Sequence, residues 1–288
     1  MRAVSLHRDV LVVTSALLHV NCVIVRGASE GEREHAGDVC SQQPPCSHGD
    51  TGESGGETFL IDSPVLPDEL DALPALIAQA RFPSPSGLLA THGDWDHLLG
   101  RLAYPELALG CAQSTATRLA ESPGEAQREL RAFDEELMIE RTRPLALGSV
   151  QALPVPGRCD IGELELELHP ADGHTPDGMA VVIGWAGVLV VGDYLSTVEL
   201  PTLNDGGDLS AYIATLERLH PLVASAEHVV PGHGPVLERE RALAAIAEDL
   251  TYLLALSEGG ERAQLPVGRA TARDRGVHAH NLARVPTR

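Results

Sequence analysis

Short apolar runs along the chain alternate with longer segments in which apolar positions recur at helical spacing. Runs of about four to eight apolar residues between turn residues predict buried strands, whereas a spacing of about three to four residues predicts helices. The predicted strands cover residues 21–26, 58–62, 88–91, 107–112, 151–155, 163–170, 179–185, 188–193 and 228–231. The predicted helices cover residues 67–81, 98–104, 114–121, 124–141, 209–220 and 237–256. Strands interspersed with helices and hairpins predict an α/β domain with mixed sheets.

An apolar run near the N-terminus, residues 10–25, follows two arginines and shares this feature with secretory signal peptides. His19 and Asn21 interrupt the run, and no small-residue cleavage site follows it. We therefore predict two strands joined by a loop at residues 14–19. A second run, residues 179–191, is broken by a turn sequence and predicts a hairpin of buried strands. Neither run is expected to span a membrane.

Two segments lack this periodicity. Residues 28–56 are rich in Gly, Ser, Glu and Gln, which predicts a disordered insertion within a hairpin. The insertion contains a conceivable metal knuckle made of Cys40, Cys46, His48 and Asp50. Its spacing is loose and no second pair exists, so a solvated loop is the preferred interpretation. Residues 258–288 are interpreted as an appendage packed on a single domain of residues 1–257.

The amino-acid composition limits which binding partners and which cellular compartment we expect for the protein. The 288 residues include 41 acidic and 21 Lys or Arg side chains, for a formal charge of −20, and this field repels nucleic acid and anionic membranes. All of these basic residues are Arg, so lysine Schiff-base chemistry is excluded. The five cysteines are odd in number and scattered, which predicts a reducing cytoplasm rather than a disulfide framework. A small-molecule substrate is expected, and the oligomeric state stays open.

The most informative segment is THGDWDH, residues 91–97, which follows a predicted buried strand. It carries imidazole and carboxylate side chains, a mixture that Zn, Fe or Mn accepts. Its candidate ligands are His92, Asp94, Asp96 and His97. Later strands are followed by three more candidates, which are His174 in DGHTPDG, Asp193 in VVGDYLS and His233 in PGHGP.

In this order the motifs resemble the pattern of the metallo-β-lactamase superfamily, which is HxHxDH, a His in a GHTPG-like turn, an Asp after GD and a His in GHG. The match spans residues 21 to about 256. The resemblance implies a four-layer αβ/βα sandwich with two mixed sheets and two divalent metal ions at one edge. By motif position, it implies one metal site of His92, Asp94 and His174. It implies a second site of Asp96, His97 and His233, with Asp193 bridging the metals.

One position departs from this pattern, because Asp94 stands where the family has its second His. A carboxylate adds negative charge and is a harder ligand than imidazole, which makes Fe or Mn plausible beside Zn, the metal expected first. The flavodiiron oxidoreductases of the superfamily also have an acidic residue here. They carry a flavodoxin domain as well, which the residues after Leu256 are too few to supply. A non-haem iron oxidoreductase therefore stays an alternative.

The chemistry expected from this resemblance is hydrolysis. Two metal ions close together lower the pKa of a shared water and yield a hydroxide that attacks a carbonyl or phosphoryl centre. Asp96 and Asp193 are the candidate catalytic residues, because either could also accept a proton. We expect a small-molecule ester, thioester, lactone or similar bond to be cleaved. Thioesterases of the glyoxalase II type have His at the position of Asp94, so their particular substrate is not transferred; a ligand-binding protein without turnover is the further alternative.

Strand direction makes a prediction about the N-terminal hairpin. Asp62 ends the strand of residues 58–62 on the side expected to face the metals, where it either orients a ligand or caps a loop. An antiparallel partner then places the loop at residues 15–19 near the metals and the insertion at residues 28–56 at the far end.

A few other polar and aromatic residues stay ambiguous in the sequence. Trp95 and Tyr194 flank candidate ligands and either line the pocket or pack in the core. Three polar residues of the tail are expected to stay away from the site: His278, His280 and Asn281.

Overall fold

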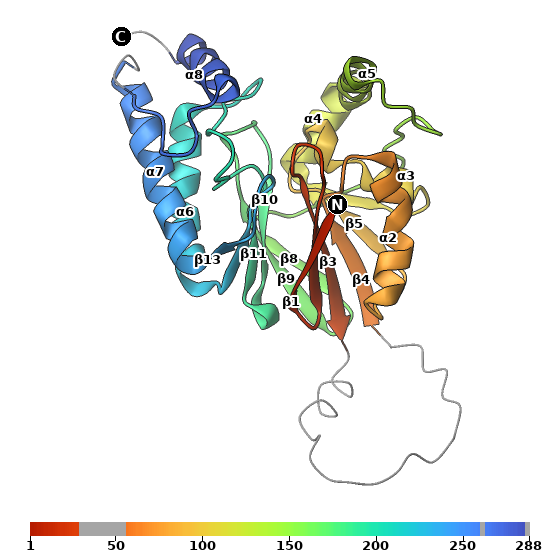
Figure 1. Ribbon diagram of the computed structural model, residues 1–288. Coiled ribbons are helices and arrows are strands. Elements are labelled where there is room, and N and C mark those ends of the chain that lie inside the picture. The colour runs from red at the N-terminus through yellow and green to blue at the C-terminus, as the bar shows by residue number, and fades with distance from the viewer. Residues whose placement is uncertain (29–55, 260–262, 286–288) are drawn as a thin grey trace, which may run out of the picture.

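The computed structural model describes residues 1–28, 56–259 and 263–285, so the candidate metal knuckle and nearly all of the predicted insertion lie outside the described residues. Two sheets form the centre of the fold (Figure 1). The first is seven-stranded, in the order β1 (Arg2–His7), β2 (Val10–Thr14), β3 (Asn21–Ala28), β4 (Gly56–Ile61), β5 (Gly87–Leu89), β6 (Leu109–Ala112) and β7 (Val150–Leu153). The second is six-stranded, in the order β13 (Leu237–Glu238), β12 (His228–Val230), β11 (Val188–Val190), β10 (Met179–Ile183), β9 (Leu164–Pro170) and β8 (Gly157–Ile161).

Both sheets are mixed. In the first, β1 to β4 pair antiparallel and β4 to β7 pair parallel. In the second, only β11 and β12 pair parallel. The hairpin predicted within residues 179–191 is confirmed, because β10 pairs antiparallel with β11.

Helices cover the outer face of each sheet (Figure 1). On the first sheet lie α2 (Pro67–Gln79), α3 (Gly100–Ala103), α4 (Gln113–Glu121) and α5 (Glu125–Leu137). On the second lie α6 (Leu209–Ser225) and α7 (Arg239–Ser257), with α8 (Ala272–Arg284) at the end of the sandwich that also carries α5. Two short 3₁₀ turns, η1 (Trp95–His97) and η2 (Gly184–Ala186), complete the elements. The layers are therefore those of the expected αβ/βα sandwich.

The alternating directions of successive side chains along a strand explain how the sheets fit between these layers. In β3, Val23 and Val25 face the second sheet, whereas Cys22 and Ile24 face the helices, and all four side chains are buried. Successive side chains of a strand point to opposite faces, so a strand that is apolar at every position fits between two apolar layers.

The structure corrects several predicted elements. No strand is predicted for β1 or β8, which are edge strands with polar, partly exposed sequences and thus a weak apolar signal. No helix is predicted for α8, whose sequence is mostly polar. The helix predicted at residues 98–104 is only the single turn α3, and the one ending at 220 continues through Pro221 to Ser225.

The predicted direction of the N-terminal hairpin agrees with the strand register. At one end of the β3–β4 pair Ala28 lies opposite Gly56, and at the other Val23 lies opposite Ile61. Asp62 and the loop between β2 and β3 therefore share an end of the sandwich. Within the described residues, no helix has the length and apolar character needed to cross a membrane.

Candidate metal centre

Loops at the ends of four strands converge at one edge of the sandwich. The loop after β5 and the turn η1 carry the THGDWDH motif, and the loops after β9, β11 and β12 each add one side chain. We call the residues that meet there the donor cluster: His92, Asp94, Asp96, His97, His174, Asp193 and His233. All the candidate ligands predicted from the sequence are brought together by the fold.

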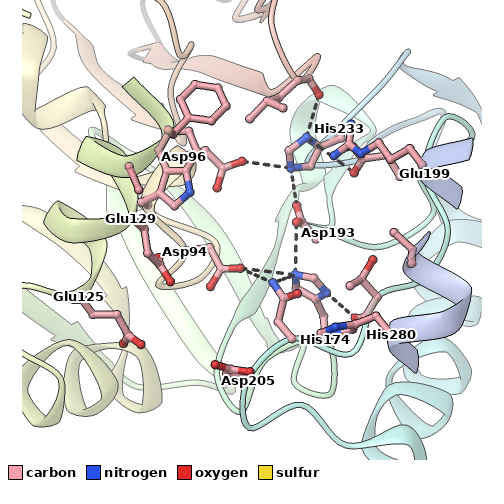
Figure 2. Close-up of a pocket in the computed structure, with 18 of the residues that line it drawn as sticks. Asp94, Asp96, Glu125, Glu129, His174, Asp193, Glu199, Asp205, His233 and His280 are labelled. Atoms are coloured by element: carbon pink, nitrogen blue, oxygen red, sulfur yellow. Dashed lines mark hydrogen bonds and ion pairs between the residues drawn. The ribbon is translucent and has the colours of Figure 1, made fainter. Parts of the chain in front are cut away.

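Two triads can be distinguished in the donor cluster. The Asp94 triad comprises His92, Asp94 and His174, and the Asp96 triad comprises Asp96, His97 and His233; in each, donor atoms lie within 4.8 Å of one another. Figure 2 shows Asp193 between the triads. Its Oδ2 lies 3.3 Å from His174 Nε2, and its Oδ1 lies 3.3 Å from His233 Nε2.

The donor cluster fits divalent metal ions. Nε2 of His92 is buried and forms no hydrogen bond with any described residue. His97 Nε2 and Asp193 Oδ1 are also buried; they lie 3.1 Å apart as an ion pair, but neither forms a hydrogen bond with a described residue. A buried polar atom without a hydrogen bond costs about 1–3 kcal/mol, and a cation would offset this cost. The mixture of imidazole and carboxylate suits Zn, Fe or Mn.

Opposite charges lie close together in the donor cluster and shift the pKa values of its members. Burial alone would lower the pKa of His174, but contacts with Asp193 and Asp94 raise it to about 10. The pKa of His233 is also raised to about 10, because Asp193 and Asp96 outweigh its burial. Burial would raise the pKa of Asp94, yet His174 and His92 hold it well below its ordinary value. Metal binding would therefore compete with protons for the imidazole nitrogens.

Each histidine of the cluster is oriented through its second ring nitrogen. His174 Nδ1 lies 2.7 Å from the Thr202 carbonyl oxygen, and His233 Nδ1 lies 2.8 Å from that of Leu18. His97 Nδ1 lies 3.0 Å from Asp62 Oδ2. Asp62 also accepts hydrogen bonds from the backbone and hydroxyl of Thr91. Of the two roles considered for Asp62, orientation of a candidate ligand is thus the one that its contacts favour.

Two residues that the sequence analysis missed contact Asp94 of the Asp94 triad, and a third contacts one of these two. Asn204 donates a hydrogen bond to Asp94 Oδ2 at 2.7 Å, and Arg118 Nη2 lies 2.8 Å from Asp94 Oδ1. Arg118 also pairs with Asp177. Asp177 stands inside the DGHTPDG motif and was a usable signal, whereas Arg118 and Asn204 have no local pattern that marks them.

A cavity of about 620 Å³ opens over the donor cluster. One wall is apolar, because Trp95 and Phe133 line it with ring centroids 4.6 Å apart. Acidic side chains form other parts of the lining: Glu125, Glu129, Glu199 and Asp205. Figure 2 shows Glu125 and Glu129 on one side of the cavity and His280 on the other.

The residues whose role the sequence left ambiguous can now be placed relative to the cavity. Trp95 lines it, whereas Tyr194 is buried and donates a hydrogen bond to the Asp172 carbonyl. The prediction that the tail stays away is wrong for His280, which lines the cavity. Asn281 is buried behind it, accepting from Leu203 N–H and donating to the Pro201 carbonyl, and so holds the loop that carries Thr202 and Asn204.

Comparisons with known proteins agree with this geometry. The sequence profile described as the Metallo-beta-lactamase superfamily matches residues 50–233. A hydroxyacylglutathione hydrolase of Anaeromyxobacter dehalogenans is 27% identical over 238 residues, which cover 81% of this chain and 74% of that protein. A metallo-beta-lactamase from Pontibacter korlensis superposes with a TM-score of 0.57 at 18% identity, covering 85% of this chain and 98% of that one. TTHA1623, solved in a di-iron-bound form, superposes with a TM-score of 0.53 at 23% identity, covering 81% and 96%.

Proposed function

The chain belongs to the metallo-beta-lactamase superfamily and is a metal-dependent hydrolase, and we propose that its donor cluster binds two divalent metal ions and cleaves a small-molecule ester, thioester or lactone. Zn is the first candidate metal, with Fe or Mn as alternatives, since the donors include both imidazole and carboxylate. The acidic charge and the free Cys22, Cys111 and Cys159 support a cytoplasmic protein without a nucleic-acid partner.

One observation carries this proposal. The donor cluster contains buried atoms without hydrogen bonds, and five of its members line a cavity that is large enough for a small molecule: Asp94, Asp96, His174, Asp193 and His233. When bound, the metal ions would supply an acidified water and positive charge opposite a developing oxyanion.

Proton transfer, positioning of the triads and exclusion of water are assigned to residues of the chain itself. Asp96 contacts His233 Nε2 at 3.4 Å through Oδ2, which leaves its second carboxylate oxygen to accept a proton in the cavity. Asp193 lies between the triads and contacts a histidine of each, so it fixes the position of one triad relative to the other. Trp95 and Phe133 bury the apolar part of a substrate and exclude water from that side of the cavity.

A thioester is the leading substrate class, supported by the hydroxyacylglutathione hydrolase relative. The charge of the lining favours a thioester whose thiol portion is neutral or cationic. Arg118 and Arg273 line the cavity but are paired with carboxylates, Arg273 with Glu199 at 2.8 Å. A glutathione thioester carries carboxylates of its own and would meet repulsion from Glu125 and Glu129.

Metal-reconstituted protein should therefore be assayed against esters, lactones and matched acyl thioesters of N-acetylcysteamine and glutathione. We expect hydrolysis that is lost on chelation and restored by metal, with the larger kcat/KM for the N-acetylcysteamine thioester. Full metal occupancy without hydrolysis of any substrate would favour a ligand-binding protein instead.

A non-haem iron oxidoreductase is the second candidate, favoured by one observation, which is the carboxylate of Asp94 beside His92 and His174. Protein purified under anaerobic conditions should be analysed for metal and then tested for turnover with O₂ or a persulfide. Tightly bound iron with redox turnover would replace the hydrolase proposal, whereas Zn with hydrolytic turnover would exclude this candidate.

A further inference from the structure

Arg118 of α4 joins two carboxylates at the edge of the donor cluster. Its Nη2 lies 2.8 Å from Asp94 Oδ1, and its Nη1 lies 2.9 Å from Asp177 Oδ1. The arginine side chain is 17% exposed and the Asp177 side chain 1% exposed. Charged contacts at these distances and this burial are stronger than surface ion pairs, which are often worth little.

Asp177 connects the ion pair with Arg118 to the backbone of the THGDWDH motif. Its second oxygen accepts a hydrogen bond of 2.9 Å from the Gly93 backbone N–H, one residue before Asp94. A Cβ at position 93 would lie 3.3 Å from Asp177 Oδ2 and 3.5 Å from Arg118 Nη1. Glycine at this position therefore lets the ion pair pack against the motif backbone.

The two oxygens of Asp94 consequently have different surroundings. Oδ1 is held by Arg118, whereas Oδ2 accepts a hydrogen bond of 2.7 Å from Asn204 and lies 3.6 Å from both His92 Nε2 and His174 Nε2. A carboxylate held through one oxygen presents the other in a fixed direction. The guanidinium also offsets the negative charge that Asp94 adds where the family pattern has a neutral His.

From this geometry we infer that Arg118 is a positioning residue that makes Asp94 a one-oxygen ligand of the metal in the Asp94 triad. The inference rests on the proposed function. Asp94, Asp177 and Arg118 then form one unit, in which the carboxylate at position 94 is usable because a cation holds and balances it. A second explanation is that Arg118 serves only the fold, through buried Asp177.

Metal titration in two backgrounds separates these explanations. Apo protein with Arg118→Met should bind Zn²⁺ in one of its two sites about 10- to 100-fold more weakly than the parent, the usual cost of losing a residue that orients a ligand. In the Asp94→His background the same change should weaken binding less than about threefold, because an imidazole needs no cation to balance it. Competition with a chromophoric chelator measures both affinities. Equal losses in the two backgrounds would overturn the inference.

Arg141→Met provides a matched control. Arg141 is 8% exposed and binds Asp134 with two hydrogen bonds, of 2.7 and 2.9 Å, outside the donor cluster. This variant should lose thermal stability and keep its metal affinity. If it loses affinity as Arg118→Met does, the effect reports general destabilisation and the inference fails.

The melting temperature of the metal-free variants keeps the inference testable if the proposed function is wrong. The Arg118→Met change should lower Tm more in the parent than in the Asp94→His background, because only the parent leaves two carboxylates without their cation. Such coupling without any binding of Zn²⁺, Fe²⁺ or Mn²⁺ by the parent would refute the proposed function and retain the pairing of Arg118 with Asp94. Absence of coupling in Tm would refute that pairing.

Discussion

The two triads of the donor cluster are similar in donor chemistry and different in support. The Asp96 triad is held by strand ends and their loops, with Asp62 beside His97 and the Leu18 carbonyl beside His233. The Asp94 triad depends on α4 and on the loop at residues 201–205, through Arg118 and Asn204. Each triad thus has a histidine whose Nδ1 faces a backbone carbonyl, that of Leu18 for His233 and that of Thr202 for His174. Beyond this shared feature, the Asp96 triad is supported by an anion and the Asp94 triad by a cation and an amide. We therefore expect metal preference to depend on Arg118 and Asn204 through the Asp94 triad rather than through the Asp96 triad.

The largest effect is expected from His97→Ala in the Asp96 triad. This residue also lies 3.1 Å from Asp193 Oδ1, so its loss affects both the triad and the residue between the triads. We expect kcat/KM to fall by about 1000-fold or more, or on the order of 4 kcal/mol, with loss of one metal equivalent. Metal analysis and steady-state kinetics measure this, with His169→Ala as the control outside the cluster. Unchanged metal content and rate would contradict the two-metal proposal.

A smaller effect is expected from Asp94→His, which gives the Asp94 triad the ligand set common in the family. Zn should be preferred over Fe or Mn by about 10-fold more than in the parent, because a borderline nitrogen ligand replaces a hard oxygen. Competitive loading followed by elemental analysis measures the preference. An unchanged preference would mean that Asp94 is not a ligand.

Glu129→Gln tests the charge of the cavity on the side of the Asp94 triad. Burial and the nearby carboxylates of Asp94 and Glu125 raise the pKa of Glu129, so the substitution removes a charge held in an acidic setting. The kcat/KM for the glutathione thioester should rise about threefold relative to that for the N-acetylcysteamine thioester. Glu165→Gln, on the exposed part of β9, is the control. An unchanged ratio would show that the lining does not select by charge.

Glu69→Gln tests the support of the Asp96 triad from the loop at residues 15–18. Burial alone would raise the pKa of Glu69, but hydrogen bonds from Ser15 Oγ at 2.6 Å and Ala16 N–H at 2.8 Å lower it. A lowered pKa in the folded state stabilises the protein above the unfolded-state value of about 4.3, and this contribution is lost as pH falls through the folded-state value. The variant should lose about 1 kcal/mol at pH 7, and less as the pH falls below about 4.

Unfolding curves at several pH values check this expectation, with the same Glu165→Gln variant as the control, since Glu165 pairs with exposed Arg158. A difference between parent and Glu69→Gln that stays constant with pH would contradict the role of the ionised carboxylate.

The smallest effect is expected from replacing residues 29–55 with Asn-Gly between the paired Ala28 and Gly56. This turn suits a two-residue hairpin connection, and the register places it at the end of the β3–β4 pair opposite Asp62. Both kcat/KM and Tm should stay close to the parent values. A large loss of kcat/KM would show that this segment contributes to one of the triads, against the hairpin direction.

The buried strands and the motifs that follow them could be predicted because their signals are local. The apolar run of β3 and the short segment from His92 to His97 each lie within a few residues of chain, so periodicity and motif order suffice to find them. The edge strands β1 and β8 were missed for the opposite reason. Their polar side chains face solvent. What holds these strands in the sheet is backbone pairing with one neighbouring strand, and backbone pairing has no signature in the order of apolar residues.

The periodicity of the sequence predicted an α/β domain with mixed sheets, and the order of its motifs predicted, through the family resemblance, the layered sandwich and the residues that meet in the donor cluster. Only the tertiary structure decided which distant residues surround that cluster: Arg118 from α4 and Asn204 from a loop contact it, and His280 from α8 lines its cavity. A polar side chain on a helix or loop has the same local pattern whether it faces solvent or a buried carboxylate. The contact between Arg118 and Asp94 depends on how α4 packs beside β6 and β7, and this packing is a property of the whole core.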